Sequence, residues 1–287
     1  MRRRHMFRTV GAIGSALATL VVALTTAWAP AQAATSAVND WSCTPSAAHP
    51  EPVVLLHGLT SNGEANWSYH GPKLAAAGYC VFSLTYGENS PGSGTGGWRP
   101  IDESAQQIGA FIDRVLAETG AAKVDLVGHS EGAFQSLYVP KVAGYAPKVA
   151  KVVALAPPTH GTTFQNLVTL GQLLGGQEFV NMLTDGFSCF ACTDIIKGGP
   201  AVARLTTGPI AQPGVKYTII ATRYDALVTP TSTSFVNEPG VTNYYVQDKC
   251  PFDPVGHIGI AVDPGVTSMI LNGLDGGKIT CGFGLPL

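Results

Sequence analysis

The sequence has 287 residues, of which 45% are hydrophobic and 13% charged, and its formal net charge at pH 7 is -2. A chain of this length and apolar content can bury one large core. Phosphate contacts need clustered Lys and Arg, and no such cluster follows the first eight residues, so a nucleic acid partner is not expected.

The N-terminus has the pattern of a secretory signal peptide. Four arginines among the first eight residues precede an uncharged, mostly apolar stretch over 10–28, and Ala31-Gln32-Ala33 offers small residues for cleavage. A membrane anchor is the alternative, but Gly, Ser and Thr dilute the stretch. Arg3-Arg4 would also suit a twin-arginine signal, although cysteines favour the general secretory route. We predict a secreted protein with a signal peptide over 1–33, one domain over 34–287 and no stable membrane span.

Cleavage would lower the count of Lys and Arg from 17 to 13 against 19 Asp and Glu, which gives a net charge of -6. All six cysteines lie after the cleavage site, as in exported proteins with disulfides. Proximity along the chain favours three pairs: Cys43 with Cys80, Cys189 with Cys192, and Cys250 with Cys281. The C-x-x-C form at Cys189 also suits redox or metal chemistry, but there is no second C-x-x-C and no paired His at ligand spacing, so a structural disulfide is preferred.

Apolar patterns along the chain alternate between predicted strands and helices. Strands are expected over 52–56, 80–84, 124–129, 151–158, 216–222 and 241–246. Helices are expected over 72–77, 101–119, 133–142 and 264–274, and Gly120 should end the second of them. This order predicts an α/β fold with a mostly parallel central sheet and helices on both faces.

Two segments depart from this alternation. Residues 92–97 formally match the dinucleotide pattern G-x-G-x-x-G, but Trp98-Arg99-Pro100 follows and forbids the required helix, so a flexible loop is predicted. Residues 160–214 contain an apolar helical stripe between two core strands. We predict a helical insertion that is either plain core or a wall or lid of an apolar substrate cleft.

A strand running into Gly-x-Ser-x-Gly is the strongest chemical signal. Ser130 lies between Gly128 and Gly132, directly after the apolar strand and before a helical run. A sharp strand-to-helix turn lifts such a serine hydroxyl clear of the sheet, and the glycines leave room for the turn. The alternative is a glycine-bracketed surface turn with an ordinary serine. The strand and helix context favours a nucleophile.

A serine hydroxyl needs an imidazole to take its proton and a carboxylate to orient that imidazole. Asp225 follows the strand over 216–222, and His257 lies in the loop after the last strand, so the chain order is Ser, acid, His. Asp248 is the main alternative acid, with Asp253 also near His257 in sequence. The alternative bases are His57, His129 and His160, and their positions in the chain argue against them.

An oxyanion needs two backbone N–H donors, one after the nucleophile and one in the loop after an early strand. These map to Glu131 and Leu59. His57-Gly58 lets the chain turn so that the Leu59 amide faces Ser130, with His57 as a structural residue that holds the loop by hydrogen bonds.

These segments together resemble the secreted bacterial lipases and esterases of the α/β-hydrolase superfamily, in particular lipase class 2. The resemblance covers nearly all of the mature chain. It rests on the segments 52–58, 124–132, 155–162, 221–230 and 256–260. It implies an α/β-hydrolase fold and hydrolysis of triacylglycerols or other carboxylic esters, with Ser130, Asp225 and His257 as the triad. Glu131 departs from the family, which often has an amide or apolar residue there, and this leaves chain-length preference open.

The sequence therefore predicts a monomeric ester hydrolase acting on lipid or other acyl esters, in part at an oil–water interface. A polyester depolymerase or an acyltransferase would use the same site, and a non-catalytic lipid-binding protein is the alternative from another class. No metal or organic cofactor is expected. A calcium ion among the loop acids stays open, although no ordered run of oxygen ligands is present.

Overall fold

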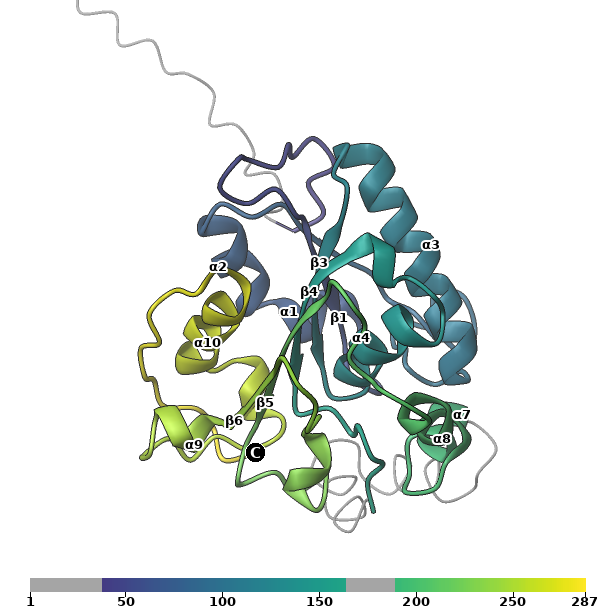
Figure 1. The fold of residues 1–287 in the computed structure, drawn as a ribbon, viewed down its shortest axis with the longest axis vertical. Coiled ribbons are helices and arrows are strands. Elements are labelled where there is room, and N and C mark those ends of the chain that lie inside the picture. The colour runs from purple at the N-terminus through teal and green to yellow at the C-terminus, as the bar shows by residue number, and fades with distance from the viewer. Residues whose placement is uncertain (1–37, 164–188) are drawn as a thin grey trace, which may run out of the picture. The chain divides into compact units, whose positions relative to one another are not determined.

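A parallel sheet runs through the computed structural model, which describes residues 38–163 and 189–287 (Figure 1). Within those residues the sheet has six strands in the order β2-β1-β3-β4-β5-β6, and every neighbouring pair is parallel. Its strands are β1 (Val53–Leu56), β2 (Val81–Ser83), β3 (Val124–His129), β4 (Val149–Leu155), β5 (Lys216–Ala221) and β6 (Val241–Tyr245). The predicted mostly parallel sheet is confirmed. The predicted signal peptide and the central part of the predicted insertion lie outside the described residues.

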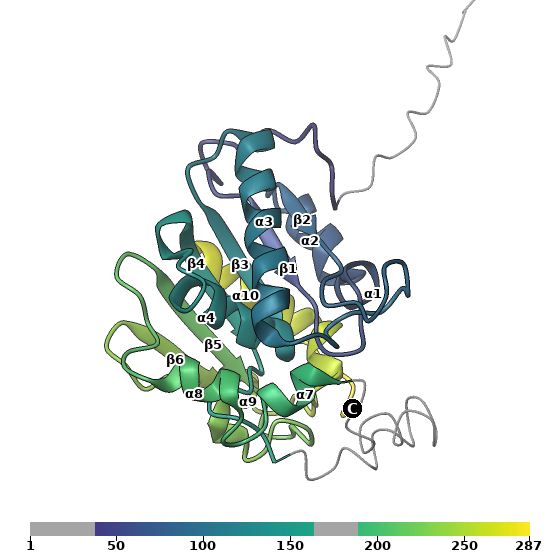
Figure 2. The ribbon, with the colours of Figure 1, turned by 90° about the vertical axis from the view of Figure 1, so that its right-hand side faces the viewer.

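Helices cover both faces of the sheet, as the alternating pattern predicted (Figures 1 and 2). On one face lie α3 (Ile101–Thr119) and α4 (Glu131–Lys141), and on the other lie α2 (His70–Ala76) and α10 (Pro264–Asp275). Strand β1 shows why both faces are apolar. Val54 and Leu56 belong to the core under α3 and α4, whereas Val53 and Leu55 belong to the core under α2 and α10.

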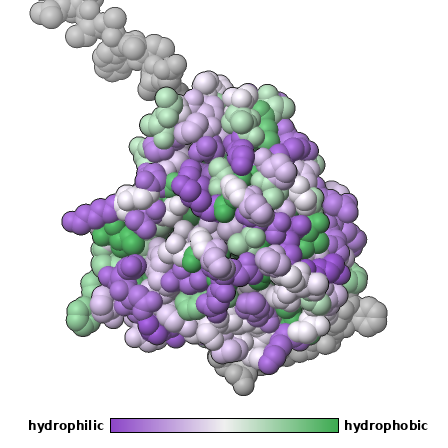
Figure 3. Space-filling view, in the orientation of Figure 1, coloured by the Kyte–Doolittle hydropathy of each residue, from purple (hydrophilic) through white to green (hydrophobic). Residues whose placement is uncertain are grey.

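The shorter helices lie in the connections between these elements. They are α1 (Gly63–Trp67), α7 (Phe190–Asp194), α8 (Pro200–Thr206) and α9 (Val246–Lys249), with 3-10 turns η1 (Ala146–Lys148), η2 (Thr231–Ser234) and η3 (Gly259–Ala261). None of the helices that the structure describes is long and apolar enough to cross a membrane. Figure 3 shows one face of the molecule, on which hydrophilic and hydrophobic residues are interspersed over this core.

Helix α3 has the predicted limits, and a local signal defines its C-terminal end. Gly120 follows it in the left-handed conformation, with φ 68°, and its N–H donates to the carbonyl of Leu116. Helix α4 begins two residues earlier than predicted, at Glu131, because the turn at Ser130 leads directly into it. Helix α1 was not predicted, since five residues are too few for an apolar period.

Three disulfides join the cysteines in the pairs Cys43–Cys80, Cys189–Cys192 and Cys250–Cys281. The first ties the segment before β1 to the start of β2, and the second closes the turn that leads into α7. The third ties the loop after α9 to the C-terminal segment. The C-x-x-C pair is therefore bonded within itself and packs against Trp98 and Leu59.

Candidate active site

Ser130 lies on a sharp turn between β3 and α4. Its backbone has φ 56° and ψ -120°, a strained conformation for a residue with a side chain. Gly128 and Gly132 must lack a side chain because other backbone atoms lie close to them. A Cβ at Gly128 would lie 2.2 Å from the Gly132 oxygen, and a Cβ at Gly132 would lie 2.2 Å from the Leu56 oxygen. The predicted strand-to-helix turn at Ser130 is therefore present.

Gly132→Ala is expected to destabilise the protein by about 3 kcal/mol or more, because the new methyl group meets backbone oxygens of a central strand that cannot move aside. Gly120→Ala is the matched control. A Cβ there meets nothing within 4 Å, so only the left-handed backbone at φ 68° opposes it, at a cost of about 1 kcal/mol. Urea unfolding of both variants measures the difference, and equal losses would contradict this account of the turn.

Ser130, His257 and Asp225 form one hydrogen-bonded line. The Ser130 Oγ lies 2.8 Å from the His257 Nε2, and the His257 Nδ1 lies 2.7 Å from the Asp225 Oδ2. His257 and Asp225 are only 2% and 7% exposed. A carboxylate can only accept, so the Nδ1 carries the proton and the Nε2 is left to accept from the serine hydroxyl.

Asp225 is held by the loop that follows β5. Its Oδ1 accepts from the backbone amides of Leu227 and Val228, at 2.9 and 2.8 Å. The Thr222 hydroxyl donates to the Val255 carbonyl at 2.5 Å, which links this loop to the one that carries His257. Asp225 therefore reaches His257 from a strand end that is 32 residues away in the chain.

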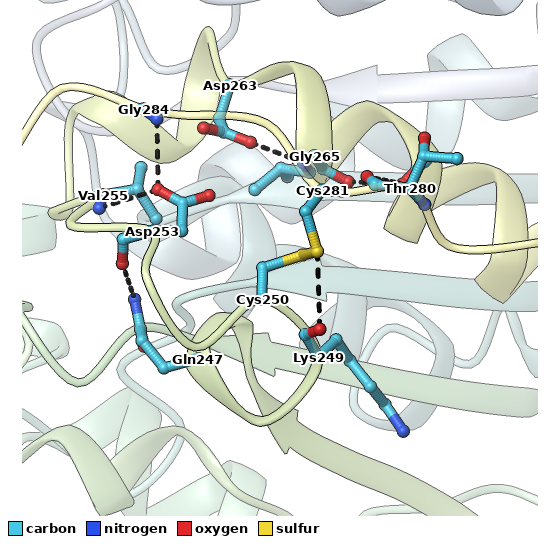
Figure 4. The surroundings of a disulfide bond; sticks show 12 residues. Gln247, Lys249, Cys250, Asp253, Val255, Asp263, Gly265, Thr280, Cys281 and Gly284 are labelled. Atoms are coloured by element: carbon cyan, nitrogen blue, oxygen red, sulfur yellow. Dashed lines mark hydrogen bonds between the residues drawn. A yellow bond between two sulfur atoms is a disulfide. The ribbon is translucent and has the colours of Figure 1, made fainter.

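The loop that carries His257 is held on both sides. The ring Nε2 of His129 lies 2.9 Å from the His257 carbonyl oxygen, and the Gly256 N–H donates to the Leu285 carbonyl. Just before this loop, the Asp253 carboxylate accepts from two amides, and Cys250 is bonded to Cys281 (Figure 4). These contacts fix the imidazole without using either ring nitrogen.

The other candidate bases and acids have different partners. Burial lowers the pKa of His57 to about 4 and that of His129 to about 3, so both are neutral at pH 7. The Nε2 of His160 lies 3.0 Å from the Phe235 carbonyl oxygen. Asp248 forms an ion pair with the guanidinium of Arg223, at 2.5 Å. The structure therefore brings Asp225, and not Asp248, to His257.

The two predicted oxyanion donors lie on either side of Ser130. The Glu131 amide is at the N-terminus of α4, and the Leu59 amide is in the loop after β1. This loop approaches Ser130 closely, since a Cβ at Gly58 would lie 3.1 Å from the Ser130 Cβ. Among the residues described, neither amide has an acceptor, whereas the Gly58 and Thr60 amides on both sides of Leu59 donate to Asn66 and Gly96.

Asn66 and Tyr86 support this loop and were missed by sequence reasoning. The Asn66 Oδ1 accepts from the Gly58 amide at 3.0 Å, and the Tyr86 hydroxyl lies 2.5 Å from the His57 carbonyl oxygen. The N-cap of α1 at Asn62, which accepts from the Ala65 amide, is a sequence signal that would have placed Asn66 on a helix. No local pattern marks Tyr86. His57 holds the loop as predicted, because its Nδ1 donates to the Gly58 carbonyl at 2.8 Å.

A cavity of about 340 Å³ opens beside Ser130 and His257. Most of the side chains that line it are apolar, and they come from segments that are far apart in the sequence. They include Leu59, Ile195, Leu227, Val228, Ile258, Val262, Leu285 and Leu287. Ile195 belongs to the described end of the predicted insertion, so part of that segment contributes to the cavity. Such a lining accommodates an acyl chain better than a charged group.

The described part of the chain contains no group of three or more His, Cys, Asp or Glu side chains that could hold a metal ion. Asp253 and Asp263 lie buried together near the C-terminal segment (Figure 4). Burial, and then the neighbouring Asp253 carboxylate, raises the pKa of Asp263. A raised pKa favours a shared proton over two adjacent buried charges.

Comparisons with known proteins give matches to a family model and to curated relatives. A family model described as alpha/beta hydrolase fold matches residues 51–180. A triacylglycerol lipase of Pseudarthrobacter phenanthrenivorans is 32% identical over 130 residues, which are 41% of this chain and 36% of that protein. One of Pseudomonas fragi is 30% identical over 146 residues, which are 48% and 46%. The matches thus span less than half the length of these curated relatives.

Two solved structures share the fold at low identity. Aspergillus fumigatus lipase B has a TM-score of 0.61 and 18% identity, covering 85% of this chain and 57% of its own. The pyrethroid hydrolase PytH has a TM-score of 0.51 and 16% identity, covering 79% and 98%. At these identities the likeness shows the arrangement of elements only.

Proposed function

We propose that the chain, whose fold is that of the α/β hydrolases, is a secreted serine hydrolase that cleaves carboxylic esters of lipids. The observation that carries this proposal is the hydrogen-bonded line from Ser130 through His257 to Asp225. A binding protein has no physical need for these three groups in this order, whereas acyl transfer to a serine requires each of them.

In the first half of the reaction, the Ser130 Oγ attacks the ester carbonyl while the His257 Nε2 takes the hydroxyl proton. Asp225 stabilises the imidazolium that forms and keeps its Nδ1 proton in place. The carbonyl oxygen becomes an oxyanion between the Leu59 and Glu131 amides, and both have no other acceptor in the described residues. The α4 N-terminus adds its positive dipole end at the same point.

In the second half, the imidazolium gives its proton to the departing alcohol, and an acyl group remains on Ser130. Water then attacks the acyl-enzyme with His257 as general base, which releases the acid and restores the serine. This chemistry needs only groups of the chain itself. Acyl transfer to another alcohol would follow the same steps with water excluded, and no contact among the described residues favours it over hydrolysis.

The apolar cavity supports a lipid acyl chain as the group that is bound. Its lining by leucine, isoleucine and valine would gain free energy from each methylene removed from water, about 0.8 kcal/mol per group. The three disulfides support an oxidising compartment and hence secretion, together with the N-terminal pattern. The expected substrate is a triacylglycerol or a related acyl ester.

The test is turnover of p-nitrophenyl esters from acetyl to palmitoyl in solution, and of triacylglycerols as emulsions, with Ser130→Ala as the blank. We expect kcat/KM to rise from acetyl to medium-chain esters as methylenes fill the cavity, by about tenfold per added pair of methylenes until it is full. A fluorophosphonate probe should add covalently to Ser130, as located by mass spectrometry.

Turnover of short esters only would make the protein an esterase without a lipid substrate. Equal and negligible turnover by the wild type and Ser130→Ala, with no labelling, would overturn the hydrolase proposal and leave lipid binding as the activity to measure.

A further inference from the structure

The side chain of Glu131 is fully buried beside the proposed oxyanion site. It belongs to the residue directly after Ser130 and is 0% exposed. A buried carboxyl group is costly unless it is paired or neutral. The role of the Glu131 backbone amide as an oxyanion donor does not explain why its carboxyl group is buried, so the side-chain contacts need an explanation of their own.

Two polar side chains lie within hydrogen-bond distance of the Glu131 carboxyl. The Tyr86 hydroxyl lies 2.8 Å from its Oε2, and the Gln135 Nε2 donates to its Oε1 at 3.0 Å. The same Tyr86 hydroxyl lies 2.5 Å from the carbonyl oxygen of His57. The Tyr86 ring is stacked on the His57 ring, with centroids 4.1 Å apart. Glu131 is thus joined through Tyr86 to the loop that carries Leu59.

The number of hydrogens available for these contacts indicates whether the Glu131 carboxyl group is ionised or neutral. The Tyr86 hydroxyl has one hydrogen but two oxygens within hydrogen-bond distance, the His57 carbonyl and the Glu131 Oε2. If Glu131 were ionised, one of these two contacts would join oxygens with no proton between them. If Glu131 is protonated, its Oε2 donates to Tyr86, and Tyr86 donates to His57. Only the neutral acid satisfies both contacts.

Among the described residues, no cationic side chain faces Glu131 to favour the anion. None of the ion pairs in residues 38–163 and 189–287 includes it. The titratable groups that face it are Tyr86, whose pKa burial and the Glu131 charge raise well above 10, and beyond it His57, which burial keeps neutral. Burial accordingly raises the pKa of Glu131 to about 7.

We propose that Glu131 is a positioning residue which, as a neutral carboxylic acid, holds the His57–Leu59 loop against Ser130 through the Tyr86 hydroxyl. The inference rests on the proposed ester hydrolysis, since the loop matters there as an oxyanion donor. A single residue would then supply one oxyanion amide from its backbone and hold the other through its side chain.

Ionisation of Glu131 would weaken the site in two ways. The Tyr86 hydroxyl would turn to the carboxylate and release the His57 carbonyl, so the Leu59 amide would lose its fixed position. The new negative charge would also oppose the oxyanion in a water-poor site. Both effects act on the transition state more than on the bound ester, so kcat should fall and KM should change little.

The pH dependence of kcat and KM in Glu131→Gln, Tyr86→Phe and the control Tyr138→Phe tests the proposal. The glutamine amide can donate to Tyr86 as the acid does but cannot ionise. We expect the wild type to lose about tenfold in kcat above pH 7, and Glu131→Gln to lack this decline. Tyr86→Phe should lower kcat about tenfold at pH 6 with little change in KM, because it frees the loop.

Tyr138→Phe is a matched control, since Tyr138 is a buried tyrosine of α4 whose hydroxyl also bonds a carboxylate, Asp102, away from Ser130. It should change kcat by less than about twofold. The same alkaline decline in Glu131→Gln as in the wild type, or equal effects of Tyr86→Phe and Tyr138→Phe, would overturn the proposal.

A second measurement does not depend on turnover. It therefore distinguishes a failure of this inference about Glu131 from a failure of the proposed function. The folded state binds the Glu131 proton up to pH 7, and the unfolded state releases it near 4.5. Wild-type stability should therefore fall relative to Glu131→Gln as pH rises from 4.5 to 7. The Tm of the wild type minus the Tm of Glu131→Gln should fall over this range and then level off. A difference that does not change with pH would overturn the neutral acid.

Discussion

Ser130→Ala and His257→Ala are each expected to lower kcat about 10⁶-fold on an ester that the wild type hydrolyses well. The two side chains act as one unit across a 2.8 Å hydrogen bond, so loss of either removes the activated nucleophile. The remaining rate would come from the oxyanion donors and the apolar cavity alone. Single-turnover and steady-state kinetics with purified protein measure the loss.

The double variant provides the control. If Ser130 and His257 form one catalytic unit, Ser130→Ala/His257→Ala should be no slower than either single variant, because the second change removes nothing that still acts. Losses that multiply, or a His257→Ala variant within about tenfold of the wild type, would show that another base serves Ser130.

Asp225→Asn is expected to lower kcat about 10⁴-fold. The Asp225 Oδ1 accepts from two backbone amides, so the amide oxygen of asparagine would keep that position and present its NH₂ group to the His257 Nδ1. The imidazole would then carry its proton on the Nε2, where it cannot accept from Ser130. The loss should appear in kcat while the fold, measured by Tm, stays close to that of the wild type.

Asp248→Asn separates Asp225 from its alternative. Asp248 pairs with Arg223 at the surface, where both side chains are more than a third exposed, so the change should alter kcat by less than about twofold. A larger loss in Asp248→Asn than in Asp225→Asn would show that Asp248, and not Asp225, is the acid of the triad.

The similarity to known proteins reaches only part of this machinery. The family match covers residues 51–180, which include the loop at Leu59 and the turn at Ser130. Asp225 and His257 lie beyond it, and their roles are supported by their order in the chain and by the hydrogen bonds they make. The two mutational tests of these residues therefore carry more information than a test of Ser130 alone.

Local patterns were sufficient for the elements of the fold. Apolar runs bounded by turn residues predicted the six strands, and the period of α3 together with Gly120 predicted its two ends. The Gly-x-Ser-x-Gly segment predicted the turn at Ser130, because only glycine fits where backbone oxygens would lie 2.2 Å from a Cβ. These features depend on residues that are close together in the chain.

Contacts between distant residues could be predicted only indirectly, from chain order and the family resemblance, and their geometry required the tertiary structure. His257 meets Ser130 across 127 residues and Asp225 across 32, and only the positions of the strand ends separate Asp225 from Asp248 as its partner. The burial of Glu131 against Tyr86, 45 residues earlier, has no local pattern either. Sequence determined which segments become strands, helices and the serine turn, since short-range sterics and apolar periodicity decide those. The structure decided the partners, because side-chain pairing depends on how the sheet brings its strand ends together.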